Sequence, residues 1–177
     1  MDINDSRIQR AEEFWFNISS KLRIRAIPAA HPKITRDTDG NLEAVGYLID
    51  PQGKRIYIAG DTFVDEEILD ALLKEGPIHT AFLPVIEHSF FRARRGIIGN
   101  LSVHEAFQFA DELGVKQLVL VHWDMFAANA VDPEEIRFIC ERKKPAFELL
   151  RQPSMLNLGD VRWFGGLGSQ TSQGDPG

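Results

Sequence analysis

The order of the predicted elements indicates an α/β fold, because strands and helices alternate along most of the chain. Three apolar runs of strand length are each followed by a segment whose hydrophobic residues recur at helical spacing. The chain has 177 residues, of which 44% are hydrophobic and 26% charged, so it can form one domain with a hydrophobic core. We therefore expect residues 1–164 to form a single domain. The glycine-, serine- and glutamine-rich residues 165–177 are expected to be a disordered tail.

The amino-terminal part is predicted to contain a helix, a strand and a hairpin. Hydrophobic residues recur at helical spacing across 6–19, namely Ile8, Ala11, Phe14, Trp15 and Ile18. Residues 22–29 alternate like a half-buried strand, and a loop rich in turn formers follows. Residues 44–60 are typical of a β-hairpin, with Asp50-Pro51-Gln52-Gly53 as its turn.

The remaining elements follow from apolar patterns and helix-end signals. We expect helices at 64–75, 102–114 and from Asp132 to about Lys143, and strands at 79–86 and 116–123. Ser102 and Glu105 match a capping box, and Pro133 suits a first helical position. "SMLNLG" and "VRWF" are predicted to be two short final strands. The segment between residues 87 and 101 is predicted to be a loop with three arginines.

Charge and cysteine content exclude several classes of protein. The formal net charge is −6, which argues against a general nucleic-acid surface. No apolar run reaches the length of a membrane span, and no signal peptide opens the chain. Cys140 is the single cysteine, so intrachain disulfides and cysteine-rich zinc motifs are excluded, and we expect a core thiol. These features are typical of a cytoplasmic enzyme or binding domain.

Three groups that can bind metals stand at the ends of apolar strands. His31 follows "IRAIPAA", Asp61 follows "IYIAG", and His122 follows "LVLV". Functional groups gather beyond strand ends in α/β folds, and imidazole with carboxylate suits Zn²⁺, Mn²⁺ or Fe²⁺. The alternative for Asp61, or for its neighbour Thr62, is a turn or helix cap. The alternative for each histidine is an ordinary core or loop position.

Weaker candidates lie in the loops beside these strand ends. Glu87 and His88 follow the strand at 79–86, and Asp124 could orient the imidazole of His122 or cap the next segment. The three arginines of the loop are either a solvated basic segment or an anion clamp, because guanidinium groups match phosphate and carboxylate oxygens. They are Arg92, Arg94 and Arg95. His79 is expected at the surface, and His104 is expected to face solvent or its neighbours.

The ordered motifs "AIPAAH", "IYIAGDT", "SVHEAFQFADELG" and "VLVHWDMF" resemble the second half of a metallo-β-lactamase-fold hydrolase. Over residues 22–145 the chain is most similar to the branch that contains L-ascorbate-6-phosphate lactonase. The resemblance implies half of an αββα sandwich, with helices on the outer face of a mixed sheet. It also implies that Asp61 is the catalytic carboxylate bridging two metals, that His122 is the last metal-binding histidine, and that His31 matches the middle one. Arg94 and Arg95 resemble a loop near the substrate.

The superfamily's first metal motif, His-x-His-x-Asp-His, is absent from the 177 residues. The expectation is therefore an incomplete, truncated domain that holds a divalent ion, Zn or Mn, at low occupancy. The resemblance implies hydrolysis of a lactone or ester, such as a phosphorylated sugar lactone, with little activity in this chain alone. The alternative is a non-catalytic remnant or a half-domain that binds a protein partner. A homo-oligomer is then also expected, because the uncovered sheet face should be apolar.

Overall fold

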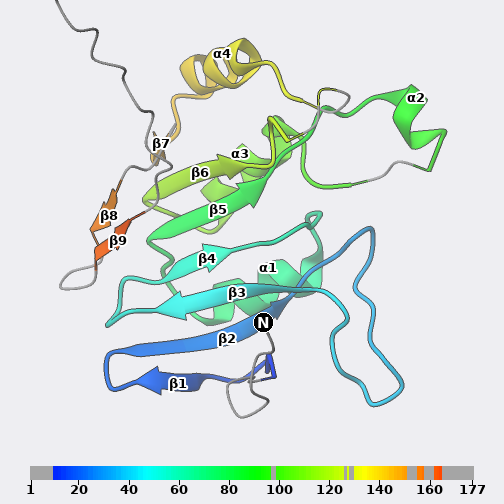
Figure 1. The fold of residues 1–177 in the computed structure, drawn as a ribbon. Helices are drawn as coiled ribbons and strands as arrows, with labels where there is room; N and C mark the ends of the chain where they lie inside the picture. Colours follow the sequence, from blue (N-terminus) through cyan, green and yellow to red (C-terminus); the bar gives the residue numbers. More distant parts are fainter. Residues whose placement is uncertain are drawn as a thin grey trace, which may run out of the picture.

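The computed structural model describes residues 10–96, 99–125, 127 and 130–150, and the backbone of 155–157 and 162–164. The predicted disordered tail at 165–177 lies outside the described residues. One seven-stranded sheet forms the centre of the molecule (Figure 1). Its strands pair in chain order: β1 (Phe16–Ser19), β2 (Leu22–Pro28), β3 (Val45–Asp50), β4 (Ile56–Ile58), β5 (Thr80–Pro84), β6 (Gln117–Val121) and β7 (Glu148–Leu150).

The sheet is mixed, as the α/β prediction requires. Strands β1 to β4 pair antiparallel through hairpins, whereas β4 to β7 pair parallel. Parallel neighbours need crossovers, and here these contain α1 (Glu66–Lys74), α3 (Val103–Glu112) and α4 (Pro133–Lys143). The carboxyl ends of β4, β5 and β6 therefore meet at one edge of the sheet.

The helices pack on one face of the sheet, where they form the core with the strands. Both α1 and α3 lie behind the sheet in Figure 1, and their buried side chains include Ile68 and Leu72 of α1 and Phe107 of α3. They pack in one cluster with inward residues of the strands, such as Leu48 and Tyr57. Helix α4 packs beside α3, and Cys140 is partly buried against the core. The predicted placement of the two helices on one face is confirmed.

Local capping explains where the helices begin. Ser102 Oγ accepts from the backbone N–H of Glu105, and the Glu105 carboxylate accepts from the backbone N–H of Ser102, so the predicted capping box is present. Asp132 caps α4 ahead of Pro133. Helix α1 is capped by Asp65, so neither Asp61 nor Thr62 is its N-cap. The alternative that Asp61 or Thr62 caps α1 is therefore excluded.

The prediction of an amphipathic helix at 6–19 is wrong for residues 10–19, the part that the structure describes. Residues 10–15 are irregular, and Phe16–Ser19 form β1 instead. The reason lies in tertiary contacts: Trp15 Nε1 donates to Glu75 Oε2 over 2.9 Å, and the Arg23 guanidinium stacks on the Trp15 ring at 4.2 Å.

Two other elements were not predicted, the short helix α2 (Phe90–Ala93) and β7. The two final strands are confirmed as β8 (Met155–Asn157) and β9 (Arg162–Phe164).

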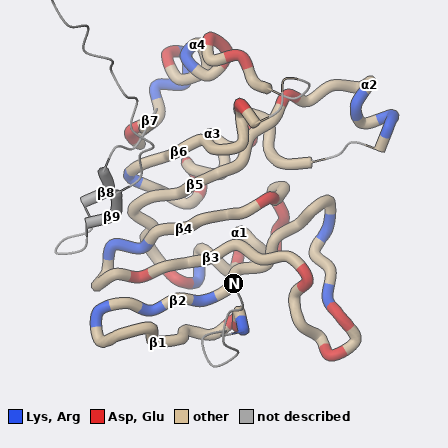
Figure 2. Tube along the Cα trace, in the orientation of Figure 1, with Lys and Arg blue, Asp and Glu red and all other residues tan. Residues whose placement is uncertain are grey.

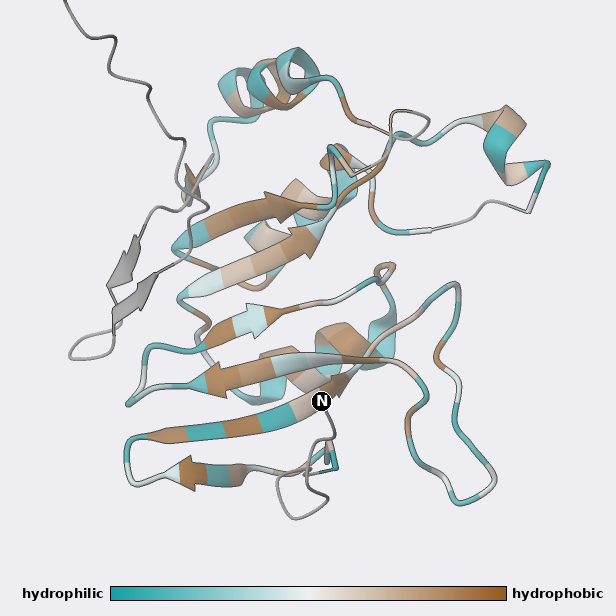
Figure 3. Cartoon of the chain, in the orientation of Figure 1, coloured by the Kyte–Doolittle hydropathy of each residue, from teal (hydrophilic) through white to brown (hydrophobic). Residues whose placement is uncertain are grey.

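The second face of the sheet carries a row of apolar side chains. Tyr47, Ile58, Phe82, Val119 and Leu150 stand in register on successive strands from β3 to β7. They alternate with core residues and so point away from the helices. Tyr47 is 37% exposed and Ile58 is 40% exposed, and Figure 3 shows how hydrophobic these strands are. None of the helices in the described part of the chain is long and apolar enough to cross a bilayer.

Candidate functional site

Asp61 and His122 meet at the carboxyl ends of the parallel strands. Asp61 follows β4 and His122 follows β6, on either side of the end of β5. His122 Nε2 lies 3.7 Å from Asp61 Oδ1. The Asp61 side chain is 54% exposed and the His122 side chain 17% exposed, so the carboxylate is accessible while the imidazole is largely enclosed. The sequence expectation that these two residues converge is met.

The backbone at His122 and at Gly60, just before Asp61, departs from ordinary strand geometry. His122 has φ 68°, a left-handed conformation that is unfavourable for a residue with a Cβ. Gly60, just before Asp61, has φ 66°, and a Cβ there would approach the carbonyl oxygen of Val45 to 3.1 Å. A strained position such as that of His122 persists where the surrounding structure holds it, and such positions gather at functional sites. The turn at Gly60 brings the carboxylate of Asp61 to the edge of the sheet.

Thr62 fastens this turn to the end of β2. Its buried hydroxyl oxygen accepts from the backbone N–H of Ala30 over 2.9 Å, and the N–H of Phe63 donates to the carbonyl oxygen of Ala30 over 2.9 Å. His31, the next residue, therefore reaches the same edge. A Cβ built on Gly99 would lie 3.5 Å from His31 Nε2.

His31 does not join Asp61 and His122 around one point. Over the part of the chain that the structure describes, no group of three or more histidine, cysteine or acidic side chains is arranged to hold a metal ion. Asp61 and His122 nevertheless have the chemistry of a metal site, because carboxylate and imidazole together suit Zn²⁺ and Mn²⁺. Together they would supply two of the three or four protein ligands that a tightly held ion needs.

Asn100 is a site residue that the sequence did not reveal. It lies just before α3, is 2% exposed, and donates from Nδ2 to Asp61 Oδ1 over 3.2 Å. Its backbone is left-handed, with φ 48°. The signal available in the sequence is weak: Gly99-Asn100 stands before a capping box, and asparagine tolerates the left-handed region better than most residues.

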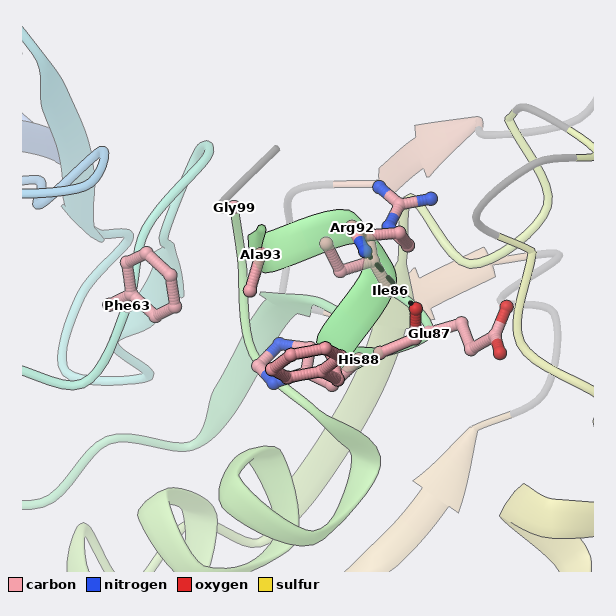
Figure 4. Close-up of a pocket in the computed structure, with 9 residues that line it drawn as sticks. Phe63, Ile86, Glu87, His88, Arg92, Ala93 and Gly99 are labelled. Carbon is pink, nitrogen blue, oxygen red and sulfur yellow. Dashed lines mark hydrogen bonds between the residues drawn. The ribbon is translucent and has the colours of Figure 1, made fainter. Parts of the chain in front are cut away.

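A pocket of about 340 Å³ opens beside Asn100 (Figure 4). His88 Nε2 lies 3.0 Å from the carbonyl oxygen of Asn100, which can only accept, so Nε2 carries the proton. The His88 ring stands edge-on to Phe63, with centroids 6.4 Å apart. In Figure 4 His88 lies toward Phe63, whereas the Glu87 carboxylate extends to the opposite side. The lining residues are Phe63, Ile86, Glu87, His88, Ser89, Phe90, Arg92, Ala93 and Gly99.

The other predicted residues lie around this region. Arg92 lines the pocket from α2, while Arg94 and Arg95 are exposed just after that helix and are not among the lining residues. Figure 2 shows basic residues on and just after α2 and acidic residues near the end of β4.

Asp124 is exposed two residues after His122, and His104 is exposed on α3 as expected. His79 is partly buried rather than at the surface.

Comparison with known proteins identifies the family. The model of the beta-lactamase superfamily domain matches residues 5–123. A UPF0173 metal-dependent hydrolase of Thermococcus onnurineus is 33% identical over 66% of this chain and 47% of its own length. A protein of Salmonella paratyphi B named "Probable L-ascorbate-6-phosphate lactonase UlaG" is 26% identical over 67% of this chain and 32% of its own length. The chain thus spans half or less of the length of these curated relatives.

Solved structures agree on the fold. A metallo hydrolase from Ignicoccus hospitalis superposes with a TM-score of 0.61 at 20% identity, covering 82% of this chain and 57% of that one. The metallo-beta-lactamase fold protein YhfI from Bacillus subtilis gives a TM-score of 0.56 at 12% identity, over 80% and 51% of the two chains. The mixed sheet with its helix layer is therefore that of the metallo-β-lactamase fold, and the chain belongs to the beta-lactamase superfamily.

Proposed function

We propose that this chain carries one side of the metal centre of a metal-dependent hydrolase that opens a lactone or ester. The observation that supports the proposal best is the Asp61–His122 pair, 3.7 Å apart across the end of β5. A carboxylate and an imidazole held together at a strained strand end have little structural purpose, because Asp61 caps no helix and is half exposed.

The residues divide the chemistry between them. A divalent ion bound here would act as a Lewis acid and lower the pKa of a bound water molecule. Asp61 and His122 would hold the ion from the ends of β4 and β6, on either side of β5. The pocket beside Asn100 receives the organic part of the substrate, because Phe63, Ile86 and Phe90 give it apolar walls. Glu87 and Asp124 are proposed to act only through their neighbours, since both are exposed.

The substrate class follows from the basic residues and from similarity to the lactonase. Arg92 lines the pocket, and Arg94 and Arg95 follow just after α2. Guanidinium groups match phosphate oxygens, so a lactone that carries a phosphate group, such as a sugar-phosphate lactone, fits this arrangement. His31 is proposed as a further ligand that closes on the site when an ion is bound, because its Nε2 already lies beside Gly99.

Turnover requires more ligands than the described residues provide. We propose that the missing ones come from the His-x-His-x-Asp-His motif implied by the resemblance. The test compares hydrolysis of a sugar-phosphate lactone and its dephosphorylated form by this chain alone and by the chain fused to a segment that carries the motif, each with Mn²⁺ or Zn²⁺.

Only the fused protein should show turnover. This activity should prefer the phosphorylated substrate and be lost in Asp61→Ala and His122→Ala. Turnover by the chain alone in the usual range of about 1–10³ per second would contradict the proposal that the site is incomplete. A fused, folded protein that binds metal and hydrolyses no lactone or ester would contradict the proposed reaction.

A second candidate, a half-domain that binds a protein partner, is supported by the apolar row from Tyr47 to Leu150. Two sheets that pack face to face use side chains of this kind. The partner proposed for this face is a second apolar sheet, because the row crosses five strands in register and its exposed members are the aromatic Tyr47 and the branched Ile58. The metal and sheet proposals are compatible, since the Asp61–His122 pair lies at the edge of the sheet.

A further inference from the structure

We infer that Asn100 is a positioning residue that fixes the orientation of the Asp61 carboxylate for metal binding. This inference rests on the proposed function and deepens it. The direct observation is the bond from Asn100 Nδ2 to Asp61 Oδ1, 3.2 Å long and made by a side chain that is almost fully buried. Asp61 itself is half exposed, so this buried amide restricts a carboxylate that would otherwise rotate in solvent.

Asn100 is an unfavourable residue for stability. Its backbone is left-handed, and its Oδ1 is buried without a hydrogen-bond partner among the described residues. An unpaired buried acceptor costs free energy, and the left-handed backbone adds a cost that is smaller for asparagine than for most residues. A residue that combines two such costs and still donates to a site carboxylate is better explained by function than by packing.

The position of Asn100 is itself firmly held. Leu101, the next residue, bridges to Val85 beyond the end of β5, and its N–H donates to the carbonyl oxygen of Pro84 over 3.2 Å. The carbonyl oxygen of Asn100 accepts from His88 Nε2 over 3.0 Å. Asn100 therefore stands beside the end of β5, and it links Asp61 to His88 in the pocket wall.

The hydrogen bond from Asn100 determines which oxygen of the Asp61 carboxylate stays free. Asn100 and the His122 imidazole approach the same oxygen of Asp61, at 3.2 and 3.7 Å. Oδ2 is thereby left on the other side of the carboxylate, available to a second ligand or ion. Loss of the amide should free both oxygens to rotate. Outer-shell partners of metal ligands typically contribute about 10–100-fold to metal affinity, and we expect an effect of this size for Asn100.

The test uses Asn100→Gly, because glycine adopts φ 48° freely and should keep the backbone in place. The first readout is metal-free: three-bond couplings in the NMR spectrum of the isotope-labelled chain report the side-chain rotamer of Asp61. One rotamer is expected in the wild type and an average of rotamers in Asn100→Gly. Asn100→Asp, which replaces the donor by a second carboxylate, should also release Asp61.

The matched control is Lys144→Gly. Lys144 is exposed after α4 and has φ 46°, so the substitution relieves the same backbone conformation away from the site. Calorimetric titration with Mn²⁺ is the second readout, in which Asn100→Gly should bind about 10–100-fold more weakly and Lys144→Gly should match the wild type.

The outcomes separate this inference from the proposed function. Rotamer averaging in the wild type, or unchanged couplings in Asn100→Gly, would overturn the positioning role. A wild type that binds no Mn²⁺ but loses its Asp61 rotamer in Asn100→Gly would support the fixed orientation and count against the proposed metal centre. Equal Mn²⁺ affinity in the wild type and in a folded Asn100→Gly would overturn the inference while leaving the metal centre in place.

Discussion

At the scale of single residues, Asp61 and Thr62 show how adjacent polar side chains take different roles. The Thr62 hydroxyl is buried and ties β2 to the turn, whereas the Asp61 carboxylate is exposed and faces His122. The sequence placed Asp61 correctly at a strand end but left capping as an alternative, because turn statistics are the same for both roles. The structure excludes Asp61 as the cap of α1, which is Asp65, and gives Asp61 a long-range partner in Asn100, 39 residues away.

Thr62→Val should destabilise the protein by about 1–3 kcal/mol, because the substitution leaves the buried N–H of Ala30 without its acceptor. Thr62→Ser keeps the hydroxyl and is the matched control, with a smaller loss. Urea unfolding measures both. A Thr62→Val protein as stable as the wild type would show that the hydroxyl does not hold the turn.

His79 should make stability depend on pH. Burial disfavours its imidazolium form, and Lys54 and Lys116 repel it, so the pKa of His79 lies below its ordinary value of 6.5. The unfolded chain then binds the proton more readily than the folded one. The stabilising contribution is therefore complete above about pH 6.5 and is lost as the pH falls through the folded pKa. In His79→Gln, the unfolding free energy should fall less between pH 7 and pH 5 than it does in the wild type. An equal fall in both proteins would show that other groups cause the pH dependence.

At the scale of elements, local signals predicted some parts of the chain well and others poorly. Helix α3 was predicted with its cap, because Ser102 and Glu105 interact within one turn. Strand β1 was predicted as helix, because Phe14, Trp15 and Ile18 also fit helical spacing and the contacts of Trp15 with Glu75 and Arg23 are distant in sequence. Helix α2 spans four residues, too few to produce a periodic pattern.

Ser102→Ala should lower stability by about 1 kcal/mol, because it removes the acceptor for the N–H of Glu105. Ser102→Thr retains that acceptor and should stay close to the wild type. Thermal unfolding followed by circular dichroism distinguishes the two variants. An equal loss of stability in both variants would indicate that packing at residue 102, rather than the cap, causes the loss.

At the scale of the whole molecule, the helices cover one face of the sheet and leave the apolar row on the other. The chain covers 57% and 51% of two solved relatives, so those proteins contain about as much structure again. The family resemblance predicted this architecture, while periodicity alone predicted only alternating strands and helices. The described residues bring together Asp61 and His122, whereas three or four protein ligands usually hold such an ion.

Ile58→Asp should reduce binding of a hydrophobic dye and any self-association, because Ile58 is a member of the apolar row that is 40% exposed. Leu73→Asp is the control, since Leu73 is 49% exposed on α1, on the helix side of the sheet. Dye fluorescence and sedimentation velocity provide the measurements. Equal effects of both substitutions would contradict a specific role for the apolar row.

The central claim, that Asp61 and His122 form one side of a metal centre, is tested most directly by calorimetric titration of the purified chain with Mn²⁺ and Zn²⁺. We predict binding of one ion at modest affinity. That affinity should fall at least about tenfold in Asp61→Ala and in His122→Ala, while His104→Ala, which removes an exposed histidine of α3, leaves it unchanged. Binding that is equally tight in both Asp61→Ala and His122→Ala, with both variants folded, would contradict the account.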